Sequence, residues 1–292
     1  ATYFYESNHD FIRSTANFGY TNQFGLDKSK HFVTPVDLSL VETELRPDFA
    51  AQLESFKNPL LDNIFETHIL TAMRYAFVFN NKGEKDGSYW RVRATLPETA
   101  GNLPYLYNII TEGYVEYNDT DAYEIASINF FQYLKFDVDA SYHYDFNPWS
   151  SVAARVAFGL GVPYGNSSVL PFEKRYFLGG ANSMRAWPLR RLGPGSYTKS
   201  GDLQFEQTGE LMLETNAEYR FDIISALKGA LFVDAGNIWT LAEDETRPGG
   251  VFEPGDFISE MAIGGGFGVR IDLVFFVLRT DFAVLLRDPS FS

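Results

Sequence analysis

The sequence predicts an all-β protein, a transmembrane antiparallel β-barrel of which this chain forms a part. Three observations predict this fold: apolar and polar residues alternate along many segments, the apolar side of a segment runs for about ten residues, and tight turns alternate with long connections. Alternation with a period of two indicates β-strands. A tilted strand needs about ten residues to cross a bilayer, and short turns on one side with long loops on the other are typical of outer-membrane barrels.

The segment KFDVDASYHYD illustrates the alternation. Asp137 and Asp139 fall on one face of the predicted strand, and Phe136 and Val138 fall on the other. A soluble antiparallel sheet with one face in water would alternate in the same way, and it is the alternative interpretation. We favour the barrel because the apolar faces end in aromatic residues and the polar faces carry charges and small residues, as a lumen does.

We expect about eleven strands, and the connections between them differ in length. The predicted strands are residues 1–8, 12–23, 30–41, 65–80, 87–97, 127–145, 149–162, 207–222, 228–241, 258–272 and 274–287. The long connections are 42–64, 98–126, 163–206 and 242–257. The first of them places Phe49, Leu53, Phe56 and Leu60 at helical spacing, which predicts a short helix.

The odd strand count predicts that the barrel is incomplete. Bacterial single-chain barrels have even strand numbers, and an open sheet edge in lipid leaves backbone groups without hydrogen bonds. The sequence has no initiator methionine and starts within a β pattern. We therefore expect a mature or trimmed fragment that lacks at least one strand.

Composition excludes several classes of site. The chain has no cysteine, which excludes disulfides and thiol catalysis, and its net charge of -14 argues against a partner nucleic acid. No apolar run is long enough for a membrane-spanning helix. The acidic segments YNDTDAYE and AEDETRPGGVFEPGD lack the spacing of a calcium-binding EF-hand, so we interpret them as solvated loop charges.

Four histidines are the candidates for catalysis, and none has a catalytic motif. His143 shares a strand face with Ser141 and Asp139, but side chains two residues apart point in parallel, whereas a triad needs them to converge. We therefore expect no enzymatic activity, no cofactor and no metal site.

The stretch RYFLGGANSMRAWPLRRLGPGSY interrupts the alternation and gathers arginines in a glycine-rich loop. With ETNAEYRF, GALFVDAGNIW and GGGFGVRIDLVFFVLRTDFAVLLRDP, it resembles the C-terminal barrel of the BamA/TamA family of outer-membrane insertases, in wording closest to Bacteroidota members. The clear resemblance covers about residues 125–289. It implies a complete barrel of about 16 strands, preceded by periplasmic POTRA domains that this chain lacks, as it lacks the first strands and the last one.

The resemblance also implies a role for the loop of residues 163–206. In the family this extracellular loop folds into the lumen, and its tip carries a Val-Arg-Gly-Phe/Tyr motif whose arginine meets acidic residues of the wall. The matching residues here are Met184, Arg185, Ala186 and Trp187, with Ala in place of Gly. By position, the acidic partners implied are Glu218 and Asp234.

The alternation independently places Glu218 and Asp234 on the charged face of their strands. A guanidinium can bind carboxylates through two parallel hydrogen bonds, so we expect Arg185 to hold the loop inside an acidic lumen. The alternative for Arg185 is a solvated loop charge. Arg190 and Arg191 have no partner by motif, and we expect them to be lumen or rim charges.

The glycines of this region predict special backbone shapes. Gly179 and Gly180 enter the loop, and GPGS has the composition of a turn. The run Gly264 to Gly266 lies within a predicted strand, where glycine usually marks a bend or a close backbone approach.

The chain is thus expected to be one partial barrel domain, residues 1–292, of a Gram-negative outer-membrane protein. The resemblance implies an assembly factor that inserts β-barrel clients without ATP. Its partners would be the lipid bilayer and unfolded outer-membrane clients, with accessory lipoproteins left open. The alternatives are a two-partner-type transporter for one dedicated substrate, a passive porin and an outer-membrane hydrolase.

Overall fold

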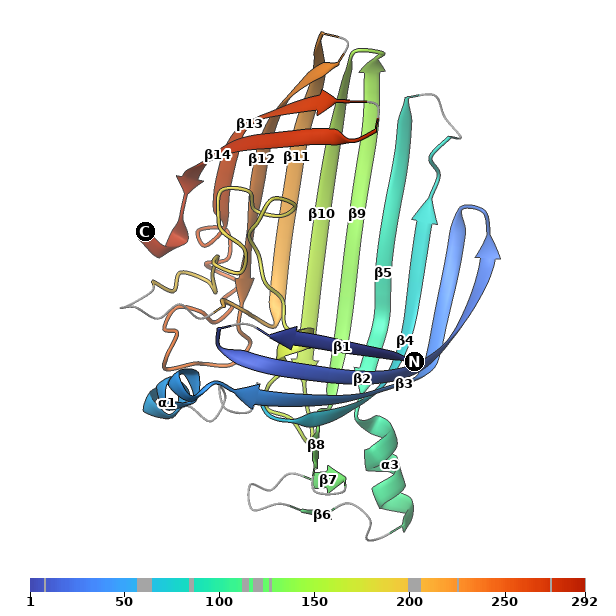
Figure 1. Ribbon diagram of the computed structural model, residues 1–292, viewed down its shortest axis with the longest axis vertical. Helices are drawn as coiled ribbons and strands as arrows, with labels where there is room; N and C mark the ends of the chain where they lie inside the picture. Colours follow the sequence, from blue (N-terminus) through green and yellow to red (C-terminus); the bar gives the residue numbers. More distant parts are fainter. Residues whose placement is uncertain are drawn as a thin grey trace. The chain divides into compact units, whose positions relative to one another are not determined.

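The computed structural model of this protein is an antiparallel β-sheet protein (Figure 1). It describes residues 1–7, 9–56, 65–83, 87–111, 116–117, 123–125, 128–198, 206–224, 226–273 and 275–291. The main path of the sheet runs β1-β2-β3-β4-β5-β9-β10-β11-β12-β13-β14, which is eleven strands. Within the described residues β1 and β14 end this path and do not pair with each other, so the sheet is not closed.

The strands follow the chain in order, with three short ones off the main path. The main strands are β1 (Thr2–Ser7), β2 (Phe11–Leu26), β3 (Ser29–Leu45), β4 (His68–Asn80), β5 (Ser88–Ala100), β9 (Tyr133–Asn147), β10 (Ser150–Pro163), β11 (Leu211–Ile224), β12 (Leu227–Trp239), β13 (Ala262–Asp272) and β14 (Val277–Arg287). The short ones are β6 (Glu116–Tyr117), β7 (Tyr123–Ile125) and β8 (Ile128–Phe130).

The predicted strand 127–145 was wrong as a single strand. β8 ends at Phe130 and pairs in parallel with β4, and β9 begins at Tyr133. The cause of the break is the contact of Gln132 with a distant loop. Its carbonyl oxygen accepts the N–H of Tyr164, and its own N–H donates to the Ser167 hydroxyl, so a loop takes the bonds that a ladder would use.

Other predicted boundaries also differ from the structure, two of them in an informative way. The predicted strand 258–272 begins only at Ala262, because the N–H groups of Phe257 and Glu260 bond back to Glu253 and Asp256 in helix-like turns. The connection 98–126 is not plain loop, since it holds helix α3 (Asn102–Thr111) together with β6 and β7.

The short helix predicted in the connection 42–64 is confirmed as α1 (Pro47–Phe56). Phe49 and Leu53 lie on its buried side, and Leu60 lies outside the described residues. Across the described residues, no helix has the length and apolar character needed to cross a membrane.

The chain divides into two compact units. Unit 1 comprises residues 1–77, 95–136 and 161–175, and unit 2 comprises residues 78–94, 137–160 and 176–292. In unit 1, β1, β2 and β3 lie side by side in antiparallel register (Figure 1). Its buried core consists of Phe11, Leu70, Ala72, Ala100, Phe131, Tyr133, Val169, Leu170 and Phe172.

Unit 2 contains β11, β12, β13 and β14 in antiparallel register. Its buried core joins loop residues to the wall and consists of Tyr176, Leu178, Met184, Trp187, Leu192, Ile238 and Ala262.

The two faces of the strands in unit 2 differ as the alternation predicts. Glu218 and Asp234 are buried on one face, which we call the loop-bearing face. Their chain neighbours Tyr219 and Val233 point the other way and are 42% and 49% exposed. Apolar side chains exposed next to one another, such as the stacked rings of Phe267 and Phe282, are typical of a lipid-facing surface.

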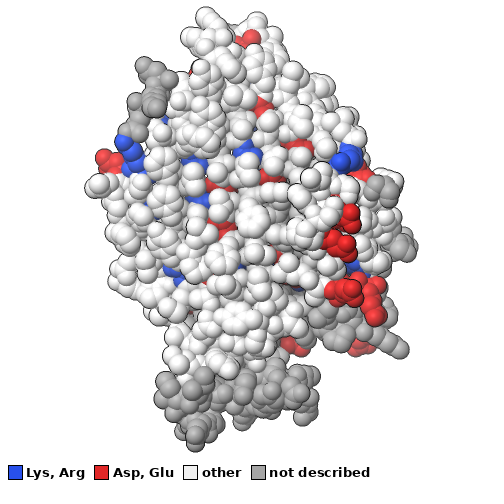
Figure 2. Space-filling view, turned by 180° about the vertical axis from the view of Figure 1, so that it is seen from behind, with Lys and Arg blue, Asp and Glu red and all other residues white. Residues whose placement is uncertain are grey.

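The face of the protein seen from behind carries charges of both signs. Figure 2 shows Lys and Arg side chains beside Asp and Glu side chains across the middle of the face seen from behind. Charges of opposite sign in proximity fit a polar surface built of ion pairs.

Candidate functional site

The loop tip of unit 2, residues 179–188, folds into a closed turn. Gly179 and Gly180 have φ angles of 111° and 91°, a region that residues with a side chain rarely adopt. The N–H of Gly180 donates to the carbonyl oxygen of Trp187 over 2.8 Å, and that of Trp187 donates to Met184 over 3.1 Å. A Cβ at position 179 would lie 2.1 Å from the Pro188 oxygen, so this turn requires glycine.

Arg185 lies at the centre of the tip and contacts both carboxylates named from the sequence. Its Nε and Nη2 donate to the two oxygens of Asp234 over 2.8 and 2.7 Å. Its Nη1 donates to Glu218 over 2.6 Å, and its backbone N–H donates to Asp234 over 3.1 Å. The guanidinium thus uses the paired geometry that makes arginine specific for carboxylates.

Strand register explains why these two carboxylates converge. In the pairing of β11 with β12, Asn216 lies opposite Asp234, and Glu218 lies opposite Phe232. All four side chains belong to the loop-bearing face, because residues two apart on a strand share a face. The Arg185 guanidinium carbon lies 3.4 Å from the centroid of the Phe232 ring, so the cation also stacks on an aromatic surface.

The site is buried, which raises the energetic importance of its charge balance. The side chains of Arg185, Glu218 and Asp234 are 6%, 8% and 0% exposed. Burial alone would lower the pKa of Arg185, but the hydrogen bonds and charges of the two carboxylates raise it above its ordinary value, so the guanidinium stays charged. Removing one partner of a buried ion pair typically costs about 3–5 kcal/mol, because the other charge is left uncompensated.

Three further residues of the network were not singled out from the sequence. Arg220 and Arg270 each donate to Glu218 over 2.6 Å, so three guanidinium groups share that carboxylate. Asn216 bridges tip and wall, donating to Asp234 over 3.0 Å and to the Ser183 carbonyl over 3.3 Å. Asn216 and Arg220 each lie two residues from Glu218, so the alternation puts them on its face, and that was the available signal.

Apolar contacts surround the ion pair. Met184 is fully buried, and Trp187 is 7% exposed. The indole N–H of Trp187 donates to Asp288 over 3.2 Å. The motif therefore places a charged side chain between two large apolar ones, which exclude water from it.

Ala186, where the family motif has glycine, fits without backbone strain. Among the described residues Arg190 is the one non-glycine with positive φ, so Ala186 adopts an ordinary conformation. Its methyl group lies over Gly264 of β13, where an added Cβ would be 2.8 Å away. The close backbone approach predicted for the glycine run is confirmed at Gly266, where an added Cβ would lie 2.0 Å from the Phe282 carbonyl oxygen.

Arg190 has a partner that its motif did not reveal. It forms an ion pair with Glu206, and its guanidinium carbon lies 4.4 Å from the ring of Phe177. No motif or spacing links residues 190 and 206, because the contact arises from the path by which the loop returns.

The loop 242–257 is less solvated than predicted. Asp244 is 7% exposed and accepts hydrogen bonds from the Thr246 N–H at 2.9 Å and from Arg247 Nε at 2.7 Å. Arg247 also donates to the carbonyl oxygen of Thr208 over 2.8 Å. The prediction of solvated charge was therefore wrong for Asp244, while Glu243 and Glu245 are exposed as expected. The segment YNDTDAYE lies mostly outside the described residues.

The residues considered for catalysis each bond elsewhere. His143 Nε2 lies 2.8 Å from Asp145, Ser141 donates to the Arg91 carbonyl oxygen, and Asp139 pairs with Arg155. The three candidates therefore do not form a triad with one another.

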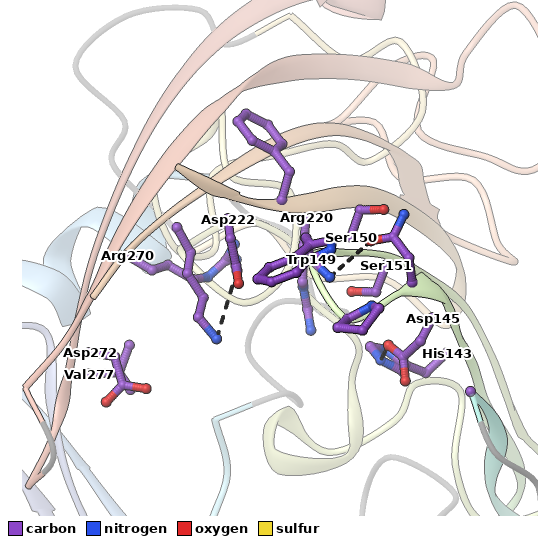
Figure 3. A pocket seen from close by; sticks show the side chains of 15 residues that line it. His143, Asp145, Trp149, Ser150, Ser151, Arg220, Asp222, Arg270, Asp272 and Val277 are labelled. Atoms are coloured by element: carbon purple, nitrogen blue, oxygen red, sulfur yellow. Dashed lines mark hydrogen bonds and ion pairs between the residues drawn. The ribbon is translucent and has the colours of Figure 1, made fainter. Parts of the chain in front are cut away.

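His143 and Asp145 line a cavity of about 790 Å³ together with Trp149, Arg220 and Arg270 (Figure 3). The cavity lies where several strand-connecting turns meet, since its lining comes from the ends of β9, β11 and β13. Its charges are mixed, because Asp222 and Asp272 also line it.

Comparison with known proteins supplies the wider context of this geometry. The profile of the Omp85 superfamily domain matches residues 122–291, more than half of the 292-residue chain. BamA from Haemophilus ducreyi, in a form lacking POTRA domains 1–3, superposes with a TM-score of 0.61 at 15% identity. The match covers 95% of this chain and 52% of that one, so the chain spans about half its length.

The likeness to BamA concerns the fold. It confirms the predicted class, a partial transmembrane β-barrel, although the sequences differ at most positions. CdiB from Acinetobacter baumannii aligns at a TM-score of 0.36 and 10% identity, over 96% of this chain and 48% of CdiB, which is too low to establish a shared fold. No curated protein matches the chain by sequence.

Proposed function

This chain belongs to the Omp85 superfamily, and on that premise we propose that the whole protein folds and inserts β-barrel clients at the outer membrane without ATP. The superfamily consists of outer-membrane barrels that insert or transport proteins. The barrel likeness to BamA supports the insertion branch of these activities. An unpaired edge strand of a β-barrel wall supplies backbone hydrogen-bond partners to a client strand, which is chemistry that needs no cofactor.

The observation that carries the proposal is the set of hydrogen bonds from Arg185 to Asp234 and Glu218. We assign to Arg185 the anchoring of the loop 163–206 within the lumen of one partial barrel domain, residues 1–292. Ordering a loop costs about 1–2 kcal/mol per residue in backbone entropy, so a loop of this length needs strong fixed contacts. Met184, Ala186 and Trp187, with Gly179 and Gly180, shape the tip that presents the arginine.

The proposed partners follow from this role. They are the lipid bilayer, through the exposed apolar face, and unfolded outer-membrane proteins, with accessory lipoproteins as further candidates. We place the protein in the outer membrane of a Gram-negative cell. The amino-acid sequences of its motifs favour a member of the Bacteroidota.

The main alternative within the superfamily is a transporter for one dedicated substrate. Its barrel would use the same loop and wall, so the number of proteins that depend on it is what separates the two functions. A passive porin or an outer-membrane hydrolase would leave the protein content of the membrane unaffected.

The test is depletion of the intact protein in its own cells, followed by quantitative proteomics of the outer membrane. A fall in many barrel proteins supports general insertion. Loss of one or a few exported proteins supports the dedicated transporter, and an unchanged membrane contradicts both. Complementation with the wild type and with an Arg185→Ala variant adds a link to the site, with Arg220→Ala as the matched control at an exposed arginine of the same network.

A further inference from the structure

The first part of the loop 163–206, residues 164–175, packs on the wall of unit 1, and we call it the loop stem. Val169, Leu170 and Phe172 are 6%, 0% and 8% exposed and belong to the core of that unit. Leu170 occupies the space above Gly161 of β10, where an added Cβ would lie 2.4 Å from its side chain. The stem is therefore part of a packed core.

An ion pair joins the stem to the start of β4. Glu173 lies in the short 3-10 turn Phe172–Lys174, and its Oε1 is 2.6 Å from Nε2 of His68, a residue only 1% exposed. Nδ1 of the same ring is 2.7 Å from the Glu66 carbonyl oxygen, which can only accept a hydrogen bond. Nδ1 therefore carries a proton.

The protonation of Glu173 decides the charge of this pair. Burial would raise the pKa of the Glu173 carboxyl, but the hydrogen bond and charge of His68, with the charge of Arg13, hold it below the ordinary value. An ionised carboxylate only accepts hydrogen bonds, so Nε2 of His68 is the donor in this contact. The contact is thus a charge-assisted hydrogen bond to a carboxylate.

A second ion pair lies one residue further along the stem. Lys174 Nζ donates over 2.6 Å to Glu98 of β5, whose side chain is 6% exposed. The hydroxyl of the fully buried Tyr133 donates to the same carboxylate oxygen over 2.8 Å. Arg74 lies 3.7 Å from the other oxygen of Glu98, so the acid is held from three directions.

An aromatic and cationic contact completes the stem. The guanidinium carbon of Arg13, in β2, lies 4.6 Å from the ring centroids of both Phe11 and Phe172. This contact ties Phe172 of the stem to a third strand of unit 1.

From these contacts we propose that Glu173 and Lys174 are positioning residues that form a second anchor of the loop, independent of the one at Arg185. The two anchors share no residue: the stem contacts lie in unit 1, and the contacts of Arg185 lie in unit 2. The tip can then leave its site while the stem stays docked, which makes the loop a tethered plug. This inference concerns the loop alone and goes beyond the proposed activity.

The absence of cysteine makes a direct test available, because an introduced thiol is the one label site in the chain. Val169→Cys reports on the stem and Met184→Cys on the tip, and both positions are buried. Purified full-length protein is exposed to a maleimide, and the labelling rate in each background is measured above that of the same protein without the introduced cysteine. No client is needed, so failure here is distinguishable from failure of the proposed function.

The Glu173→Gln change removes the negative charge at constant size. We expect it to raise the labelling rate at position 169 about tenfold, the effect of losing one charge-assisted hydrogen bond, and to leave position 184 unchanged. Arg185→Lys should raise the labelling rate at position 184 and leave the rate at position 169 unchanged. The exposed Glu54, in α1 of the same unit, gives the matched control Glu54→Gln, which should alter neither rate.

Two outcomes would overturn the inference. An unchanged rate at position 169 in Glu173→Gln and in Lys174→Gln would show that the two ion pairs do not hold the stem. Equal exposure of positions 169 and 184 in Arg185→Lys would show that a single anchor holds the whole loop. The milder His68→Gln change, which keeps a hydrogen-bond donor, should give an intermediate rate at position 169 and tests the same pair if a charge variant fails to fold.

Discussion

Ala186 of the loop tip packs directly on Gly264 of β13. A Cβ added to the glycine would lie 2.8 Å from the Ala186 methyl carbon and 3.1 Å from the Trp187 ring. Gly264 lies opposite Asp234 in the strand register, so this hollow is beside the carboxylate that Arg185 binds. Wall and tip are complementary in shape at the point where they are complementary in charge.

A side chain at position 264 should displace the tip. We expect Gly264→Val to destabilise the protein by about 1–3 kcal/mol, the usual cost of overpacking, and to raise maleimide labelling of Met184→Cys. Gly255, which has open space around it, provides Gly255→Val as the control. Unchanged labelling in Gly264→Val would show that the tip accommodates the added side chain without leaving its site.

Arginine at position 185 should not be replaceable by lysine. Lysine keeps the charge but cannot reach both Asp234 oxygens and Glu218 at once. We expect Arg185→Lys to cost about 1.5–3 kcal/mol and Arg185→Ala about 3–5 kcal/mol, because the alanine leaves a fully buried carboxylate unpaired.

The measurement for position 185 is thermal unfolding in detergent or lipid. Arg220 contacts Glu218 from a side chain that is 44% exposed, so Arg220→Ala should cost less than about 1 kcal/mol. Equal losses for the alanine variants at 185 and 220 would contradict the assignment of Arg185 as the anchor.

Trp187 contributes a polar contact as well as bulk. Its indole N–H donates to Asp288, which follows β14. Trp187→Phe keeps an aromatic ring and removes the donor, and we expect it to destabilise the protein by about 1–2 kcal/mol. A double-mutant cycle with Asp288→Ala, which removes the acceptor, measures the coupling, and additive effects of the two changes would show that the hydrogen bond contributes nothing.

The sequence was informative where contacts follow from alternation and failed where they depend on loop paths. The alternation of apolar and polar residues placed Glu218 and Asp234 on one face, and the motif named Arg185 as the group that meets them. The structure brings the three side chains together. The anchoring role of Arg185 stays a prediction. Arg220 shared the signal of that face. It was not selected, because a polar face offers many charges and alternation does not pair them.

The misplaced boundaries have the same origin. The strand break between β8 and β9 depends on bonds from Tyr164 and Ser167, more than thirty residues beyond Gln132. Burial of Asp244 depends on Arg247, whose guanidinium is held by the carbonyl oxygen of Thr208. Local periodicity carries no information about such returns of the chain.

The Asp244 contact predicts a pH dependence outside the strands. Burial alone would raise the pKa of this carboxyl, but Arg247 and Thr246 outweigh burial and hold the pKa below its ordinary value of about 4. Because the folded-state pKa is the lower one, the contact contributes its full stability above pH 4 or so and loses it as the pH falls through the depressed value.

Proteolysis of the loop 242–257 by an acid-active protease should therefore accelerate at low pH in the wild type. In Asp244→Asn the cleavage should already be fast near neutral pH, when measured with a neutral protease, and should depend little on pH; identical profiles for the two proteins would contradict the role of Asp244 in holding this loop.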